Sequence, residues 1–189
     1  MEKIFTRSVG NKDVPVFLKR DLTDQIVVLK KSNLKYDDFG KKAIQDLFEP
    51  QLISSSVVRT YNYPSSCIAW NEGNGKFSVQ KLDPRIQYST VNAILCEDIN
   101  NDGRKDLILG GNKYDLLPQF GRLDASYGEV LLNLGNRKLE LASSSVTGIL
   151  VDGQVRDIIS INSPGKNKLI SFILNQKRPV FFSVRGKRS

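Results

Sequence analysis

The spacing of apolar residues changes near residue 54, which divides the chain into two predicted parts, 1–53 and 54–189. In the first part, apolar residues recur at helical intervals, so we expect one or two short helices near the N-terminus. The first is predicted from Leu22, Ile26 and Leu29, with Thr23 as its N-cap. The second is predicted from one face formed by Tyr36, Phe39, Ala43 and Leu47, and Pro50 ends that pattern.

From residue 54 onward, short runs of β-branched and aromatic residues alternate with Gly, Asn, Pro and Ser, which is typical of strands and turns. Asn74 and Gly75 separate two such runs and predict a type I′ hairpin turn. We therefore expect a mainly β chain of antiparallel sheets, as in a sandwich, barrel or propeller. The predicted strands are SVVRTYNY, SCIAWN, KFSVQKL, VNAILCED, DLILGG, GEVLLNL, KLELAS, VRDIISIN, KLISFILN and PVFFSV.

A faint internal repeat narrows this choice of fold. NEGNGKF at Asn71–Phe77 returns as NLGNRKL at Asn133–Leu139, and VNAILCEDINNDGRKDLIL aligns with VRDIISINSPGKNKLISFIL. Radial repetition of such sheets builds propellers. We therefore predict a partial β-propeller of two to three blade-like repeats, with an insertion at 112–126 and a degenerate repeat at 133–175.

Composition and charge exclude several classes of protein. Apolar residues make up 40% of the chain, enough for a core, and no apolar run is long enough to cross a bilayer. The N-terminus has no apolar h-region, so we expect no signal peptide in this chain. The absence of histidine removes the commonest general base and zinc ligand.

The two cysteines, Cys67 and Cys96, lie in strand-like runs, so we expect buried thiols rather than a disulfide, although a bridge stays open. Most of the net charge of +8 comes from the end of the chain. Without a nucleic-acid motif or interleaved aromatics, a solvated basic tail is the simpler interpretation, and we expect no nucleic-acid partner. The tail contributes Lys177, Arg178, Arg185, Lys187 and Arg188.

The most distinctive stretch is DINNDGRKD, the loop 98–106, which lies between two predicted strands. Calcium prefers six to eight oxygen ligands, which carboxylates and amides at alternate positions of a tight turn supply. An EF-hand would carry a glutamate where this chain has Leu109, and it would lie between helices. The alternative is an Asx-rich turn without metal. The predicted calcium ligands are Asp98, Asn100, Asp102, the carbonyl of Arg104, and Asp106, with Gly103 at the bend.

These residues resemble a known family. DINNDGRKDLILGG is similar to the calcium loop of FG-GAP or VCBS-type repeats, as in the integrin α-like β-propeller, and NEGNGKF resembles the strand pair that precedes such loops. The wider stretch resembles the C-terminal part of bacterial ASPIC/UnbV-type repeat proteins. The resemblance implies a propeller with structural Ca²⁺ and a location that is extracellular, periplasmic or at the cell surface. It also implies that the rest of the propeller is missing from this chain. The second copy lacks the acids, so no second site is predicted.

Three functions follow as expectations. The first is a calcium-binding, non-enzymatic module for extracellular or cell-surface adhesion or recognition, with an unknown protein or polysaccharide ligand. The alternative is part of a polysaccharide-acting propeller enzyme, whose insertion would lie at the ligand face. The third is binding of anionic polymers through the basic tail. The possible ligand surface of the insertion consists of Tyr114, Asp115, Gln119, Arg122, Asp124 and Tyr127.

Overall fold

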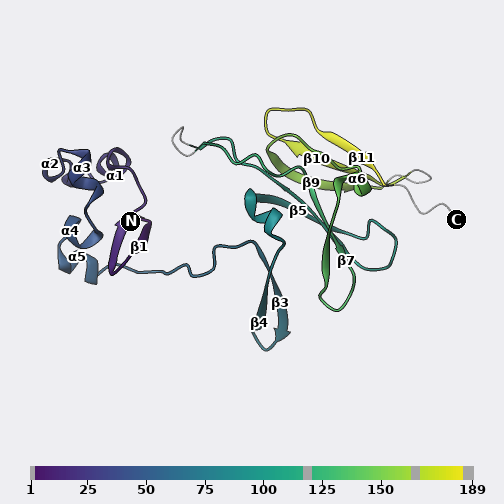
Figure 1. The fold of residues 1–189 in the computed structure, drawn as a ribbon, viewed down its shortest axis with the longest axis horizontal. Helices are drawn as coiled ribbons and strands as arrows, with labels where there is room; N and C mark the ends of the chain where they lie inside the picture. The colour runs from purple at the N-terminus through teal and green to yellow at the C-terminus, as the bar shows by residue number, and fades with distance from the viewer. Residues whose placement is uncertain (1–2, 117–120, 163–166, 185–189) are drawn as a thin grey trace. The chain divides into compact units, whose positions relative to one another are not determined.

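The computed structural model describes residues 3–116, 121–162 and 167–184 (Figure 1). The chain divides into two compact units, Met1–Asn62 and Tyr63–Ser189, and each is described by itself. Every strand pair of the described residues is antiparallel, and all helices are short. The predicted fold class, antiparallel β-sheets with short helices near the N-terminus, is confirmed.

The first unit joins a hairpin to a chain of short helices. Its apolar centre is formed by Leu22, Leu29 and Phe39, against which Ile26 and Leu47 pack. The hairpin turns at Gly10, whose φ of 60° suits glycine. The elements are β1 (Thr6–Val9), β2 (Lys12–Pro15), α1 (Lys19–Gln25), α2 (Val28–Ser32), α3 (Tyr36–Gly40), α4 (Ile44–Leu47) and α5 (Pro50–Ser54).

The first predicted helix is wrong as a continuous element. The chain leaves the helical region at Ile26, with φ −121° and ψ 84°, and α2 starts anew at Val28. The run of β-branched residues at this junction disfavours a helix. Thr23 is not an N-cap, because it lies buried inside α1, where its hydroxyl donates to the carbonyl of Arg20.

The second predicted helix is also interrupted. Gly40, a poor helix former, ends α3, and the extended Ala43 precedes α4. Phe39 and Ala43 are buried as predicted, whereas Tyr36 is exposed. Pro50 ends the predicted pattern and also begins α5. The first N–H of a helix has no partner within the helix, so a proline at this position loses no hydrogen bond.

The second unit contains three antiparallel sheets (Figure 1). A hairpin pairs β3 with β4, a four-stranded sheet has the order β5-β6-β7-β8, and a three-stranded sheet has the order β11-β10-β9. Its elements are β3 (Cys67–Gly73), β4 (Lys76–Lys81), η1 (Pro84–Tyr88), β5 (Val91–Glu97), β6 (Asp106–Gly111), β7 (Glu129–Asn133), β8 (Leu139–Ala142), α6 (Ser144–Thr147), β9 (Val155–Ile161), β10 (Leu169–Leu174) and β11 (Val180–Ser183).

One strand prediction is wrong. Residues 56–63, all of them described, form no strand, although their sequence SVVRTYNY is rich in β-forming residues. Val57, Val58 and Tyr61 are exposed there. A strand needs a partner for its backbone hydrogen bonds, and this segment has none among the described residues. The other predicted strands are all present.

The two copies of the repeated motif, NEGNGKF and NLGNRKL, form the same turn. Gly73, Asn74 and Gly75 have φ angles of 83°, 51° and 72°, and Gly135, Asn136 and Arg137 have 83°, 50° and 61°. In each copy the first asparagine of the motif accepts a hydrogen bond from the glycine N–H, at 2.8 Å for Asn71 and 3.0 Å for Asn133. The predicted turn at Asn74 and Gly75 is confirmed, and three of the retained residues, Asn71, Gly73 and Asn74, supply its Asx bond and two of its positive φ angles.

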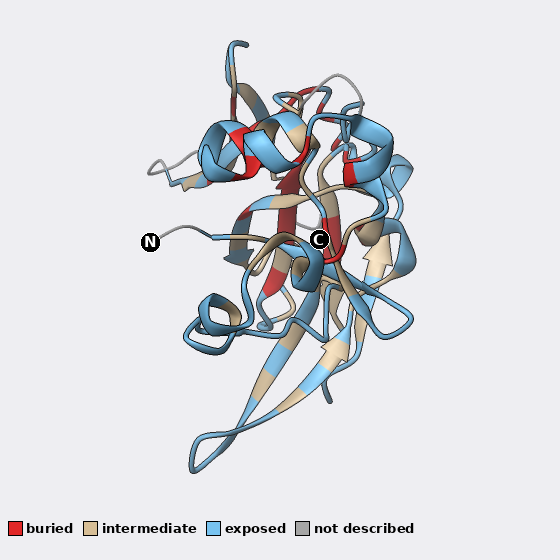
Figure 2. Ribbon diagram, turned by 90° about the vertical axis from the view of Figure 1, so that its left-hand side faces the viewer, coloured by how far each residue is buried: buried red, intermediate tan, exposed pale blue. Residues whose placement is uncertain are grey.

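The main core lies between the four-stranded and three-stranded sheets. Ala93, Ile108 and Val130 from one sheet meet Ile158 and Phe172 from the other. Gly110 permits this approach, because a Cβ there would lie 2.6 Å from a methyl carbon of Val155. Figure 2 shows buried residues along the strands and on the short helices. A smaller cluster of Ile86, Leu109 and Leu131 covers the other face of the four-stranded sheet.

Candidate functional site

The loop 98–106 connects β5 to β6 and turns its oxygen-bearing side chains inward. The carboxylate of Asp98 accepts hydrogen bonds from the N–H groups of Asp102, at 3.2 Å, and Gly103, at 2.9 Å. Asn100 accepts from the same Asp102 N–H at 3.0 Å. Gly103 has φ 83°, which allows the bend that was predicted there. The structure therefore brings Asp98, Asn100 and Asp102 together within one turn.

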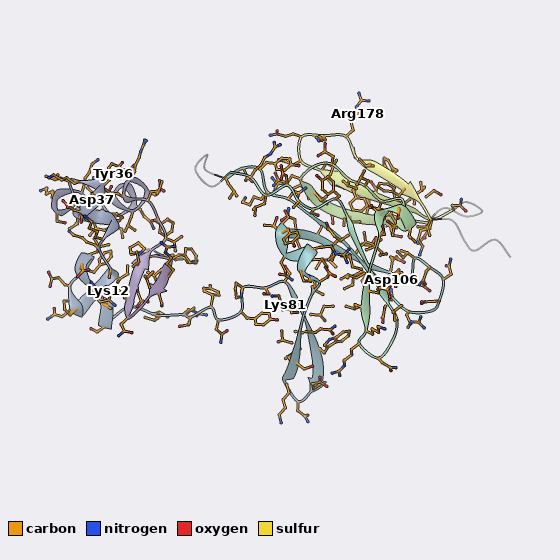
Figure 3. The ribbon with its side chains drawn as sticks, viewed as in Figure 1. Lys12, Tyr36, Asp37, Lys81, Asp106 and Arg178 are labelled. Atoms are coloured by element: carbon orange, nitrogen blue, oxygen red, sulfur yellow. The ribbon has the colours of Figure 1, made fainter. Side chains whose placement is uncertain are left out.

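Asp106 anchors this loop to the sheet. Asp106, which is labelled in Figure 3, is fully buried, with 0% of the residue exposed. One oxygen of its carboxylate accepts the N–H of Asn133 at 2.8 Å and the other accepts the N–H of Ile99 at 3.1 Å. A buried carboxylate requires such donors, because an unpaired one would be strongly disfavoured. Asp106 thus links the start of β6 to the end of β7 and to the loop.

Arg104 adds a positive charge that the sequence pattern did not predict, since only its carbonyl was assigned a role. Its guanidinium donates to Asp102 at 2.6 Å and to the carbonyl of Asn133 at 2.6 Å. The pKa of Asp102 is lowered, first by the backbone N–H of Arg104 and then by the side chain of Asn100 and the charge of Arg104. Asp102 is therefore ionised at neutral pH with an internal counter-charge beside it.

The donor set, carboxylates with an amide and a backbone carbonyl, is chemically compatible with a hard cation. In the described part of the chain, no group of three or more His, Cys, Asp or Glu side chains is positioned to hold a metal. Two of the five predicted ligands, the amide of Asn100 and the backbone carbonyl of Arg104, are not among these four side-chain types. An ionised carboxylate has about four lone-pair sites, and Asp98 and Asp106 each use two. Acceptor capacity toward a cation therefore remains at both.

Asn133 is the functional residue that the loop pattern missed. Its N–H donates to Asp106, its carbonyl accepts from Arg104, and its side chain donates to the carbonyl of Lys105 at 3.1 Å. Asn133 is also the first residue of the repeated motif NLGNRKL. The repeat singles out Asn133 in the sequence, but the contact of Asn133 with the acidic loop depends on the pairing of β6 with β7.

The second copy of the loop falls partly outside the described residues, which omit 163–166. The alignment places Lys168 opposite Asp106, and its ammonium group donates to Glu97 of the first copy at 2.8 Å. This hydrogen bond lowers the pKa of Glu97, against a smaller opposing effect of burial. The second copy therefore contributes a cation beside the first acidic loop.

The insertion forms an arm whose polar residues pair with one another. Lys113 and Leu123 exchange backbone hydrogen bonds of 2.8 and 2.9 Å. The guanidinium of Arg122 lies 5.1 Å from the ring centre of Tyr114 and 3.1 Å from Asp124. Asp115 pairs with Lys113 at 2.9 Å. Gln119 lies outside the described residues, so the structure brings together Tyr114, Arg122 and Asp124 of the predicted ligand surface.

Asn112 closes the base of this arm. Its side chain accepts from the hydroxyl of Ser89 at 2.8 Å and the N–H of Ser126 at 2.9 Å. It donates to the carbonyls of Ser126 at 2.7 Å and Gly153 at 2.9 Å. The residue is buried and has φ 79°, a conformation that asparagine tolerates better than most residues. The predicted insertion therefore leaves the sheet through a fixed, fully hydrogen-bonded asparagine.

Tyr127 lies away from the other predicted ligand residues. It lines a shallow, open depression of about 320 Å³ together with Arg85, Tyr88 and Glu129. Its backbone N–H donates to Glu129 at 3.1 Å. The described residues of this predicted surface are thus divided between the arm and the depression.

Two further features concern reactivity and charge. Cys67 and Cys96 are free and exposed, so the predicted burial of their thiols is wrong. Both lie on the outward side of strands whose alternate residues face inward.

The guanidinium of Arg137 bonds Glu72 at 2.5 and 2.8 Å and lies 5.6 Å from the ring centre of Trp70. This bond, with that from Ser78, lowers the pKa of Glu72 to about 2.

The basic tail is structured in part. Lys177 donates to the carbonyl and carboxylate of Asp152, and β11 follows Arg178, which is exposed. Arg185, Lys187 and Arg188 lie outside the described residues. Among the described residues, no helix has the length and apolar character required to span a membrane.

Comparison with known proteins adds no relative to this geometry. No family model matches the sequence, no curated protein matches it, and no solved structure matches the fold. The resemblance to FG-GAP and VCBS-type repeats therefore stands on the residues of this chain.

Proposed function

We propose that this chain is a calcium-binding, non-enzymatic β-propeller repeat module that serves adhesion or recognition outside the cell or at its surface. The observation that carries the proposal is the loop between β5 and β6. Asp98, Asn100 and Asp102 turn into one bend, and the buried Asp106 closes it at the strand. Short oxygen-bearing side chains in this arrangement suit a hard divalent cation.

The ligands of the proposed site would be Asp98, Asn100, Asp102, the carbonyl of Arg104, and Asp106. A bound Ca²⁺ would supply positive charge that holds the three carboxylates together. The chain itself orients these groups, since N–H groups of the loop already bond Asp98 and Asp102. The guanidinium of Arg104 gives Asp102 a partial counter-charge, so a cation would compete with Arg104 for that carboxylate.

The arrangement of the sheets supports a blade interpretation. Strands β5 to β8 pair in chain order, as a four-stranded blade requires. Strands β9 to β11 repeat that order and pack face to face on them, and β3–β4 shares its turn with β7–β8. We interpret β3–β4 as the outer half of one blade, β5–β8 as a second, and β9–β11 as most of a third.

The test is thermal unfolding of the intact chain in calcium and in excess EGTA. Ligand at a hundredfold excess over Kd stabilises the native state by about 2.7 kcal/mol, which a melting curve resolves. Asp98→Ala should abolish the calcium-dependent shift, whereas Asp124→Ala, in the exposed ion pair of the arm, should retain it. Equal melting temperatures with and without calcium, together with no heat of binding in calorimetry, would refute calcium binding.

The arm and the depression keep a second candidate open, part of a polysaccharide-acting enzyme. The observation in its favour is aromatic exposure, since the exposed residues Tyr88 and Tyr127 line the depression, and the half-buried Tyr114 lies on the arm. Exposed aromatic rings with polar neighbours suit sugar rings. A polysaccharide array followed by a turnover assay separates the two functions. Binding without turnover supports the module, and turnover that Tyr127→Ala abolishes supports the enzyme.

A further inference from the structure

The segment that contains α2 exposes large apolar side chains to solvent. Val27 and Val28 are 68% and 83% exposed, and Leu34 is 79% exposed. Single exposed apolar residues are normal on a protein surface, whereas three within eight positions call for an explanation. The segment belongs to the first unit, in which α1 contacts both α2 and α3 (Figure 1).

The orientation of α2 places two of these side chains on one outward surface. Leu29 and Asn33 are buried four residues apart, so they mark the inner side of the helix. Val27 already has helical backbone angles, with φ −56° and ψ −31°. Lys31 follows Val27 by four residues and Val28 by three, so the three side chains are neighbours on the outer side.

The same segment carries unneutralised positive charge. Residues 25–36 include no acid and three exposed lysines, none of which forms an ion pair among the described contacts: Lys30, Lys31 and Lys35. The nearest flanking acids have partners of their own, since Asp24 pairs with Arg20 and Asp37 pairs with Lys41. Asp38 adds one exposed negative charge, which leaves the local balance positive.

Lys19 of α1 fixes the far end of the segment. Its ammonium group donates to the carbonyl of Leu34 at 2.9 Å and lies 4.7 Å from the ring centre of Tyr36. Tyr36 is 65% exposed, so its ring lies at the surface beside Leu34. A tyrosine has an apolar body and a polar tip, which suits the boundary between water and an apolar phase.

We propose that this apolar–basic patch docks the chain on an anionic lipid bilayer. A bilayer with acidic headgroups attracts lysines to its surface and accepts apolar side chains at the edge of its hydrocarbon. An acidic polymer would pair with the lysines but would leave the apolar side chains in water. The contact is independent of calcium binding, and it would attach the module to a membrane surface. The patch consists of Val27, Val28, Leu34, Lys30, Lys31 and Lys35.

Flotation of the intact chain with lipid vesicles tests the charge of the patch. In excess EGTA, the chain should bind vesicles of phosphatidylcholine with about 30% phosphatidylglycerol and should not bind phosphatidylcholine alone. Binding should weaken in about 1 M salt, where the Debye length falls to about 3 Å. Lys31→Glu should lower partitioning at least about tenfold. The matched control is Lys12→Glu on β2, because Figure 3 shows Lys12 apart from Tyr36, and it should change partitioning far less.

A second pair of variants tests the apolar side chains at constant charge. Val27→Ser with Val28→Ser should lower partitioning about tenfold. Val57→Ser with Val58→Ser is the control, since these valines are 65% and 77% exposed and lie outside the patch, and it should bind as the unchanged chain does. All of these side chains are exposed, and circular dichroism should confirm that each variant folds.

An environment-sensitive fluorophore on Val28→Cys, with Cys67→Ser and Cys96→Ser, reports insertion directly. Its emission should shift to the blue on anionic vesicles, whereas the same label on Val58→Cys should not respond. Absence of binding to anionic vesicles, or full binding by Lys31→Glu, would overturn the proposal. Binding of heparin without binding of vesicles would also overturn it, because the partner would then be a free polyanion.

Discussion

Replacement of Asp106 by asparagine removes one charge from the most buried position of the acidic loop and changes little else. The carboxylate accepts two backbone N–H bonds, from Asn133 at 2.8 Å and Ile99 at 3.1 Å. Asparagine keeps one acceptor oxygen, and its NH₂ group meets the other N–H with no acceptor between them. One bond is lost and one buried donor is left unpaired.

The cost follows from these two bonds. A hydrogen bond to a charged group contributes about 1.5–3 kcal/mol, and an unpaired buried donor costs about 1–3 kcal/mol. The neutral amide avoids part of the desolvation of a charge, which acts in the opposite direction. We expect a net loss of about 2–4 kcal/mol in the free energy of unfolding, a large share of the roughly 5–15 kcal/mol typical of a domain. The melting temperature should fall by about 10 °C.

The assay is urea unfolding in excess EGTA, followed by circular dichroism and by the fluorescence of Trp70, the single tryptophan of the chain. EGTA separates this effect from any loss of calcium. Asp124→Asn is the matched control, because that carboxylate is exposed and pairs only with Arg122 among the described contacts. It should change stability by less than about 0.5 kcal/mol. An equally small change for Asp106→Asn would refute the anchoring role.

Two other predictions concern the contacts between repeats. Gly110→Ala should destabilise the chain by about 1–3 kcal/mol, since the added Cβ would lie 2.6 Å from a methyl carbon of Val155. Adding Val155→Ala should recover part of this loss of stability. The control Gly40→Ala should not destabilise the chain, because nothing lies within 4 Å of a Cβ at that position. The pKa of Glu72 is depressed from 4.5 to about 2, so its contribution to stability is present above pH 4.5 and is lost as the pH falls toward 2. Carboxyl NMR should show this titration and its return toward 4.5 in Arg137→Ala, and an unchanged midpoint would contradict the ion pair.

Local features were predictable because short-range chemistry decides them. The turn at Asn74 and Gly75 was read from two residues that accept positive φ, and both adopt it. The repeat was visible because Asn133 and Gly135 perform the same bonding as their counterparts in the first copy. The bend at Gly103 was predictable for the same reason.

Errors arose where a partner distant in sequence decides the outcome. The segment 56–63 has strand-forming residues, but no strand of the described chain pairs with it, so its composition alone gave a wrong prediction. Tyr36 fits a helical face but is exposed, because α3 ends at Gly40 before that face is completed. Cys96 lies in an apolar run, yet the side of β5 that faces the core belongs to Ala93 and Leu95.

By itself, the sequence determined the pattern of short strands, the turn residues, the repeat and the acidic composition of the loop 98–106, since each depends on neighbours along the chain. The tertiary structure alone decided that Asp106 is buried against Asn133, that Arg104 reaches Asp102, and which faces of the sheets meet. Those outcomes depend on how β6 pairs with β7 and how β9 packs on β5. Such pairings join residues far apart in the sequence, and local pattern carries no information about their register.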